Sequence, residues 1–169
     1  FTGAQFPPAF MQRFASFERG EPFDHARLEL LQQRLAQSEY FGQIVVAPDP
    51  EAASGGEVPV NVTLTPALRT VYTAGLLIDS DYGAGVRFGV DRRWVNDRGH
   101  RLRAKCELAQ YLDVAAAEYV FPRAASIESA WAVAARYRDE NTDAVDASSY
   151  SLSGSLIVPW RGWSVVSSL

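Results

Sequence analysis

Length, composition and charge already exclude several classes of protein. The chain has 169 residues, of which 47% are hydrophobic and 21% charged, enough for one ordinary domain or two small ones. Its 20 acidic residues outnumber its 16 basic ones and give a formal net charge of -4, without the basic excess of nucleic-acid-binding proteins. One cysteine and two histidines provide neither an internal disulfide nor a zinc-ligand spacing, and no other cofactor is predicted.

The first predicted elements are two helices and a hairpin. A short helix is expected at 9–14, where Pro7 and Pro8 supply a helix start. A second helix is expected at 24–38, capped by Asp24, with one apolar face made of Leu28, Leu31 and Leu35. Two strands follow at 43–48 and 58–65 and predict a hairpin.

A change in charge and pattern predicts a domain boundary between residues 67 and 68. Up to Ala67 the chain carries four arginines against eight acids, whereas the remainder carries twelve basic and twelve acidic residues. Helix signals also end there and alternating patterns begin. The sequence therefore predicts an α+β domain at 1–67 and an all-β antiparallel part at 68–169.

Hydrophobic residues recur at every second position from Arg69 onward, which is typical of antiparallel strands with one apolar and one polar face. Val86, Phe88 and Val90 show the pattern first, and it returns at 102–108, 127–138 and 149–160. Alanines blur the alternation in 112–121, so a bulge or a strand end is expected there. About seven strands can be counted, too few to close a large barrel.

Two architectures fit this alternation: a soluble sheet with a covered apolar face, and a membrane barrel whose apolar face meets lipid. The aromatic residues favour the barrel because they sort by the two ends of the strands, as interfacial girdles do. Long connections are expected at one end, 139–146 above all, and tight ones at the other, such as 161–162. The predicted girdle residues are Trp94, Phe121, Trp160 and Trp163 at the end with tight turns, and Tyr82, Tyr111, Tyr137 and Tyr150 at the other.

Several segments together resemble a family of outer-membrane assembly factors. Residues 17–24 (FERGEPFD), 28–41, 44–48 and 58–62 resemble the last POTRA (polypeptide-transport-associated) domain of that superfamily, with 1–3 as the tail of its first strand. Residues 64–66, 72–81 and 92–100 are similar to the first barrel strands of the TamA-like factors, also grouped as bacterial surface antigens. Such barrels have more than twice the strands counted here, so the chain is expected to be a piece of one, with open edges that favour self-association.

The resemblance implies a function in membrane-protein assembly, without enzymatic chemistry. It places the chain in the outer membrane of a Gram-negative bacterium, with the POTRA part in the periplasm, and implies three partners: unfolded outer-membrane or autotransporter proteins, a TamB-like inner-membrane protein, and outer-membrane lipid. Client strands would bind a POTRA edge formed by Gln43, Ile44, Val45, Val46 and Ala47. They would then be templated at the first barrel strand, a lateral seam that contains Val71, Tyr72, Thr73, Ala74, Gly75, Leu76 and Leu77.

One alternative of a different class stays open at the level of sequence. A soluble periplasmic or extracellular β-rich module that binds a saccharide or peptide would also combine a small α/β domain with an antiparallel sheet. It requires a layer over the apolar face, yet no helix is predicted after Ser38. His100, beside Asp97, is interpreted as a turn residue and Cys106 as a small hydrophobic residue, because neither has a visible catalytic partner.

Overall fold

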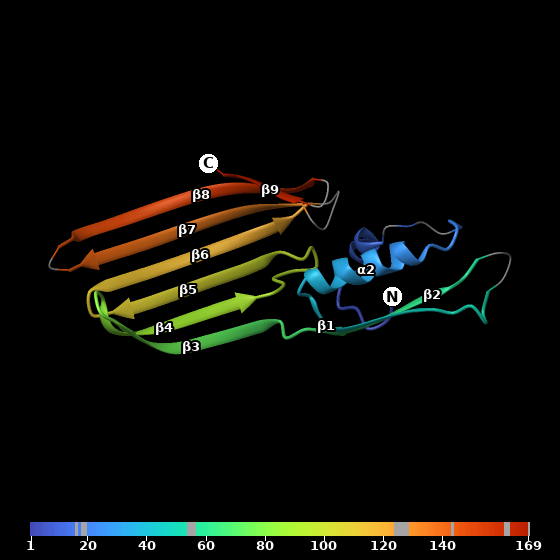
Figure 1. Ribbon diagram of the computed structural model, residues 1–169, viewed down its shortest axis with the longest axis horizontal. Coiled ribbons are helices and arrows are strands. Elements are labelled where there is room, and N and C mark those ends of the chain that lie inside the picture. The colour runs from blue at the N-terminus through green and yellow to red at the C-terminus, as the bar shows by residue number, and fades with distance from the viewer. Residues whose placement is uncertain are drawn as a thin grey trace. The chain divides into compact units, whose positions relative to one another are not determined.

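A computed structural model describes the chain except for Ser16, Glu18, Arg19, 54–56, 124–128, Asp143, Arg161, Gly162 and Leu169, and except for the side chains of residues 159, 160, 163 and 164. The chain folds into two compact units, one built chiefly of Phe1–Arg69 and the other of residues from Thr70 onward. Figure 1 labels the longest helix and the strands. Among the described residues, no helix has the length and apolar character needed to cross a membrane.

The first unit contains the expected helices and hairpin. Its elements are α1 (Pro8–Met11), the 3-10 helix η1 (Gln12–Phe14), α2 (His25–Gln37), β1 (Phe41–Pro48) and β2 (Val60–Pro66). The N-cap of α2 is Asp24, whose Oδ1 accepts a hydrogen bond from the Ala26 N–H at 3.0 Å. Leu28, Leu31 and Leu35 are buried, so the predicted apolar face of α2 is confirmed.

Aromatic rings form much of the core of this unit. Phe6 stacks on Phe10 with ring centroids 4.4 Å apart, and Phe14 and Tyr40 are buried beside them. The Arg13 guanidinium lies over the Phe10 ring at 4.9 Å, and its burial there lowers its pKa, against an opposing effect of Tyr40.

Strand β2 is paired on both sides. It pairs antiparallel with β1, and on its other side Thr2 forms a parallel bridge with Thr63. The Thr2 N–H donates to the Val62 carbonyl at 2.8 Å, and the Thr2 carbonyl accepts from the Leu64 N–H at 2.9 Å. The first residues thus continue the small sheet, at the place expected for the tail of a strand.

The second unit is a seven-stranded antiparallel sheet in which each strand pairs with the next along the chain, as Figure 1 shows. The predicted fold class, a small α+β part followed by an open all-β sheet of about seven strands, is therefore confirmed. We call the end where β3 begins and β4 ends the lower end of the sheet; it is on the right in Figure 1. The opposite end, on the left in Figure 1, is the upper end. The strands are β3 (Thr70–Asp79), β4 (Gly83–Arg92), β5 (Arg101–Ala109), β6 (Leu112–Pro122), β7 (Ala130–Asn141), β8 (Asp146–Trp160) and β9 (Trp163–Ser168).

The expected distribution of connection lengths is wrong. At the upper end the connections are 80–82, 110–111 and 142–145, whereas two of the lower connections, 93–100 and 123–129, are longer than any of these. The expected long segment 139–146 is short because β7 extends to Asn141 and β8 begins at Asp146, with these two residues paired. Polar residues at strand ends were mistaken for loop residues.

The bulge or strand end expected in 112–121 is also wrong, because β6 runs without interruption over Leu112–Pro122. β6 pairs without a register shift with β5 on one side and with β7 on the other. Ala115, Ala116 and Ala117 occupy successive positions of a regular strand, because a methyl group fits either face of the sheet.

Candidate functional site

The strand register sorts the second unit into an apolar and a charged face. Tyr72, Leu76, Phe88 and Leu152 share the apolar face with the predicted set on β5, and all the described elements of this unit are strands. Large side chains on this face are strongly exposed: 92% for Ile78, 85% for Leu76 and 77% for Leu152. A contiguous apolar surface of this kind indicates contact with a partner or a membrane.

Ion pairs occupy the opposite face. Arg87 Nε lies 2.9 Å from Glu107 Oε1, and Lys105 Nζ lies 4.0 Å from the same carboxylate oxygen. Arg103 Nε lies 3.4 Å from Asp91 Oδ2, nearer the lower end of the same face. The apolar cluster of Val120, Ala130, Ala132 and Ile157 interrupts this face at the lower end, and the alternation alone did not reveal it.

One edge of this sheet is formed by β3, which pairs only with β4 among the described strands. The Gln110 N–H donates to the Ala84 carbonyl at 3.1 Å, so the backbone groups of Ala84 face away from β3. Backbone groups of successive residues point to alternate sides of a strand. Gly75 therefore bonds inward to its partner Arg87, and the outward N–H and C=O groups belong to Tyr72, Ala74, Leu76 and Ile78.

All the predicted seam residues, 71 to 77, lie on this edge strand. A Cβ placed on Gly75 would meet no atom within 4 Å, so packing does not require glycine there. A Cβ on Gly89 would instead collide with Thr73 Oγ1, since the threonine side chain lies against the β4 backbone. The close approach that needs glycine is thus on β4, one strand inward from the edge.

The first unit has a comparable edge at β1, which contains the predicted client-binding residues 43 to 47. Because the Leu64 N–H bonds to Thr2, the backbone groups of Thr63 face β1 and meet those of Val45. The groups of Ile44 and Val46 therefore point away from β2, and no described strand pairs with them. Val45 itself exposes 46% of its surface.

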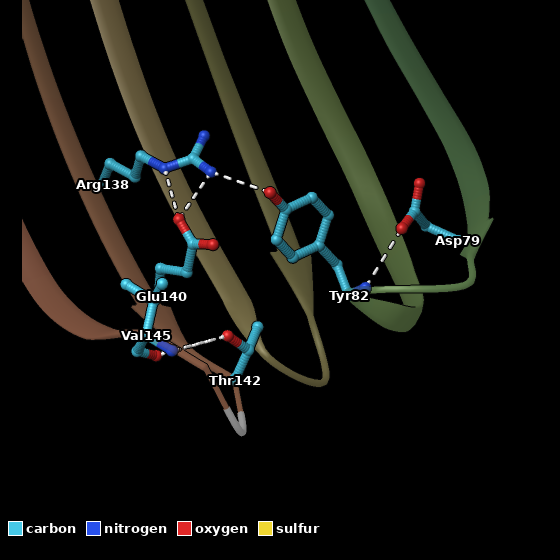
Figure 2. A network of polar contacts seen from close by, with 6 residues as sticks. All are labelled: Asp79, Tyr82, Arg138, Glu140, Thr142 and Val145. Atoms are coloured by element: carbon cyan, nitrogen blue, oxygen red, sulfur yellow. Dashed lines mark hydrogen bonds and ion pairs between the residues drawn. The ribbon is translucent and has the colours of Figure 1, made fainter.

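A polar network joins the upper ends of several strands (Figure 2). The Arg138 guanidinium on β7 donates to Glu140 Oε2 at 2.7 and 3.1 Å, and to the Tyr82 hydroxyl at 3.1 Å. Tyr82 lies in the turn between β3 and β4, where its N–H donates to Asp79 Oδ1 at 3.1 Å. Two backbone hydrogen bonds join the same region of the sheet. The Tyr111 N–H donates to the Tyr82 carbonyl, and the Asn141 N–H donates to the Tyr111 carbonyl.

The predicted girdle residues lie at the expected ends of the strands, but their side chains differ in direction. Phe121 and Tyr137 lie on the apolar face, where Tyr137 and Tyr150 form a ring pair 4.8 Å apart. The Tyr82 hydroxyl accepts a hydrogen bond from Arg138 on the charged face, so Tyr82 is not part of the girdle. Tyr111 is exposed in a turn, Trp94 is half-buried in the 93–100 connection, and the side chains of Trp160 and Trp163 lie outside the described residues.

Three aromatic residues at the lower end were missed by the girdle prediction. His100 Nδ1 lies 3.2 Å from the Tyr119 hydroxyl, and the His100 ring packs edge-on against Tyr119 and Phe121. Trp131 is the cross-strand partner of Phe121 and is 52% exposed. The alternation of the sequence places Tyr119 and Trp131 on the apolar face. This alternation could have identified both as girdle residues.

Two hollows lie apart from the predicted client-binding edges. One, of about 590 Å³, lies in the first unit between the segment before α2 and the start of β2, lined mainly by Phe1, Phe17, Phe23, Leu28 and Val60. The other is a shallow depression of about 650 Å³ on the apolar face, over alanines of β5 to β7 and beside Tyr137, Tyr150 and Leu152. Within the described ranges, no three His, Cys, Asp or Glu side chains gather closely enough to hold a metal ion.

Comparison with known proteins shows the fold at low sequence identity. No protein-family model matches the chain. Among solved structures, the chain is similar to a crystal structure of BamA from Haemophilus ducreyi that lacks POTRA domains 1–3, with a TM-score of 0.70 and 14% identity. The match covers 91% of this chain and 30% of that chain, so the present chain spans less than a third of the BamA it resembles. The sheet thus has the fold of part of a BamA barrel.

Proposed function

We propose that the chain is the part of an outer-membrane assembly factor in which a POTRA-like domain, 1–67, leads into the first strands of the barrel, 68–169. The observation that carries this proposal is the bare apolar face opposite a face of ion pairs, on strands long enough to cross a bilayer. β3 to β7 have 9 to 12 residues each, and a tilted transmembrane strand needs about 9–11.

Two further arguments support a barrel over a soluble binding module. A soluble sheet must cover its apolar face, and all the described elements of the second unit are strands. The second argument is that the sequence resemblance to TamA-like factors, which comes from motifs, agrees with the fold match to BamA, which comes from geometry.

The proposed mechanism uses backbone hydrogen bonds, without covalent chemistry. A client strand would add to the outward groups of β1 in the periplasm and then to those of β3 in the membrane. Backbone bonds tolerate many sequences, which suits a factor with many clients. Burial of client apolar surface in lipid and completion of its backbone hydrogen bonds would supply the driving force.

The experiment is quantitative mass spectrometry of outer-membrane fractions from cells with and without the full-length gene. Loss of autotransporters and a few large barrels supports a TamA-like factor, which would act with a TamB-like inner-membrane partner. Loss of nearly all barrels supports a general assembly factor. An unchanged outer membrane contradicts the proposal and favours the soluble saccharide- or peptide-binding module.

A further inference from the structure

The lower end of the apolar face carries a polar and aromatic group that its apolar surroundings do not explain. Strand register places Arg92 between Thr70 and Leu102 on this face, and Leu102 beside Tyr119. His100 precedes Leu102 by two residues and contacts Tyr119, so it shares the face. We call Arg92, His100, Tyr119, Phe121 and Trp131 the lower patch.

Three rings of the lower patch, those of His100, Tyr119 and Phe121, form one connected cluster. Ring centroids lie 5.6 Å apart for His100 and Tyr119, 5.2 Å for His100 and Phe121, and 4.7 Å for Tyr119 and Phe121. A hydrogen bond between the His100 ring and the Tyr119 hydroxyl places polar atoms at the edge of this cluster. Amphipathic rings of this kind suit the boundary between hydrocarbon and headgroups.

Arg92 brings a cationic group to the same boundary. Its Nε is buried and has no hydrogen-bond acceptor among the described residues, and its cross-strand neighbours on this face carry no carboxylate. The acid next to it in sequence, Asp91, lies on the opposite face and pairs with Arg103. A planar guanidinium in this position matches the geometry of a phosphate.

The two ends of the sheet differ in charge: basic residues predominate at the lower end, where Arg92 lies, and acidic residues at the upper end. At the lower end, the strand ends and the residues next to them contain Arg92, Arg93, Arg101 and Arg123 against Asp91, and the sequence of the 123–129 connection adds Glu128. At the upper end, the acids outnumber Arg138: they are Asp79, Asp81, Asp113, Asp139, Glu140 and Asp146. A basic band at one end of an apolar surface is complementary to anionic headgroups.

We propose that the lower patch binds the phosphate of an anionic phospholipid, with Arg92 as the phosphate ligand and the aromatic cluster beside the glycerol and upper acyl region. The inference rests on the proposed function, because it requires the apolar face to meet lipid. An anionic phospholipid fits better than a zwitterionic one, since the ammonium group of the latter would lie within the basic band.

The test measures lipid preference at Trp131 by fluorescence. The full-length protein is reconstituted in phosphatidylcholine bilayers that contain a fraction of brominated lipid, whose chains quench tryptophan fluorescence on contact. The brominated lipid is phosphatidylglycerol in one sample and phosphatidylcholine in the other. Quenching that disappears in Trp131→Phe reports the lower patch. We expect phosphatidylglycerol to quench more strongly, and Arg92→Gln to lose about fivefold of this preference, the factor for one basic residue near an anionic surface.

The controls separate failure of this site from failure of the membrane proposal. Arg87→Gln removes the same charge from the opposite face and should leave the preference unchanged. Equal quenching by the two lipids in the wild type, or equal preference in Arg92→Gln and wild type, overturns the site but not the membrane contact. No quenching by either lipid overturns both. If Arg92→Gln fails to insert, Arg92→Met replaces it: this variant removes the charge but keeps a long side chain on the apolar face, so an unchanged preference overturns the proposed phosphate contact.

Discussion

The Tyr82 hydroxyl forms a contact that connects distant strands of the sheet through a single atom. It accepts a hydrogen bond from Arg138, which lies 56 residues away in the chain on β7, whereas Tyr82 lies in the first turn of the sheet. The Arg138 guanidinium also lies 5.7 Å from the centre of the Tyr82 ring. The contact joins the tip of the β3–β4 hairpin to the upper end of β7, as Figure 2 shows.

Removal of this hydroxyl should loosen the hairpin tip. We expect Tyr82→Phe to lower the free energy of unfolding by about 1–2 kcal/mol, because the bond involves a charged donor in a half-buried position. Tyr111→Phe is the matched control: its hydroxyl accepts a bond only from the adjacent, exposed Gln110, so its effect should be under about 0.5 kcal/mol. Urea unfolding of the full-length protein in detergent measures both, and equal effects would show that the hydroxyl does not hold the hairpin.

At the scale of elements, the direction of backbone groups distinguishes neighbouring positions of the edge strand β3. The Ala74 N–H points away from β4 at the open edge of the sheet, whereas the Gly75 N–H points toward Arg87 on β4. We expect Ala74→Pro to fold but to slow client assembly about fivefold, since one templating hydrogen bond is lost. Gly75→Pro should instead destabilise the sheet by about 1–3 kcal/mol. Client assembly rates in reconstituted vesicles and unfolding curves separate the two effects, and unimpaired assembly by Ala74→Pro would argue against templating at β3.

The same reasoning applies to β1 in the first unit. Val46→Pro removes an outward N–H and should weaken client crosslinking to this edge, while Val45→Pro removes a bond to Thr63 and should lower stability by about 1 kcal/mol. The measurement is photocrosslinking of a client to the full-length protein, with unfolding curves as the control for folding. Loss of crosslinking in Val45→Pro alone would mean that the edge contributes through the fold and not through its free backbone groups.

At the scale of the whole molecule, the alternation of the sequence predicts which residues share a face of the sheet. It does not predict where strands end or which residues distant in the chain come into contact. The faces of β4 and β5 follow from alternation because each apolar residue there has a charged or glycine neighbour. Asp139 and Asn141 were expected in a loop because their types favour turns, yet they pair across β7 and β8. The contact of Tyr82 with Arg138 joins residues that are 56 positions apart in the chain, and no local sequence pattern encodes it.

The membrane proposal itself can be tested with two adjacent residues of β7. Ala135 lies on the apolar face between Ala117 and Leu152, and Ala134 lies on the charged face between Glu118 and Ser153. In a membrane, Ala135→Arg should cost about 2–4 kcal/mol because it places a cation in hydrocarbon near the middle of the strand. Ala134→Arg should change stability by less than about 0.5 kcal/mol, because it faces water and Glu118. Unfolding of both variants from lipid vesicles measures the difference. If the apolar face were covered by water or by a loosely bound partner, both variants would be tolerated alike, so equal stability of the two would contradict a lipid-facing sheet.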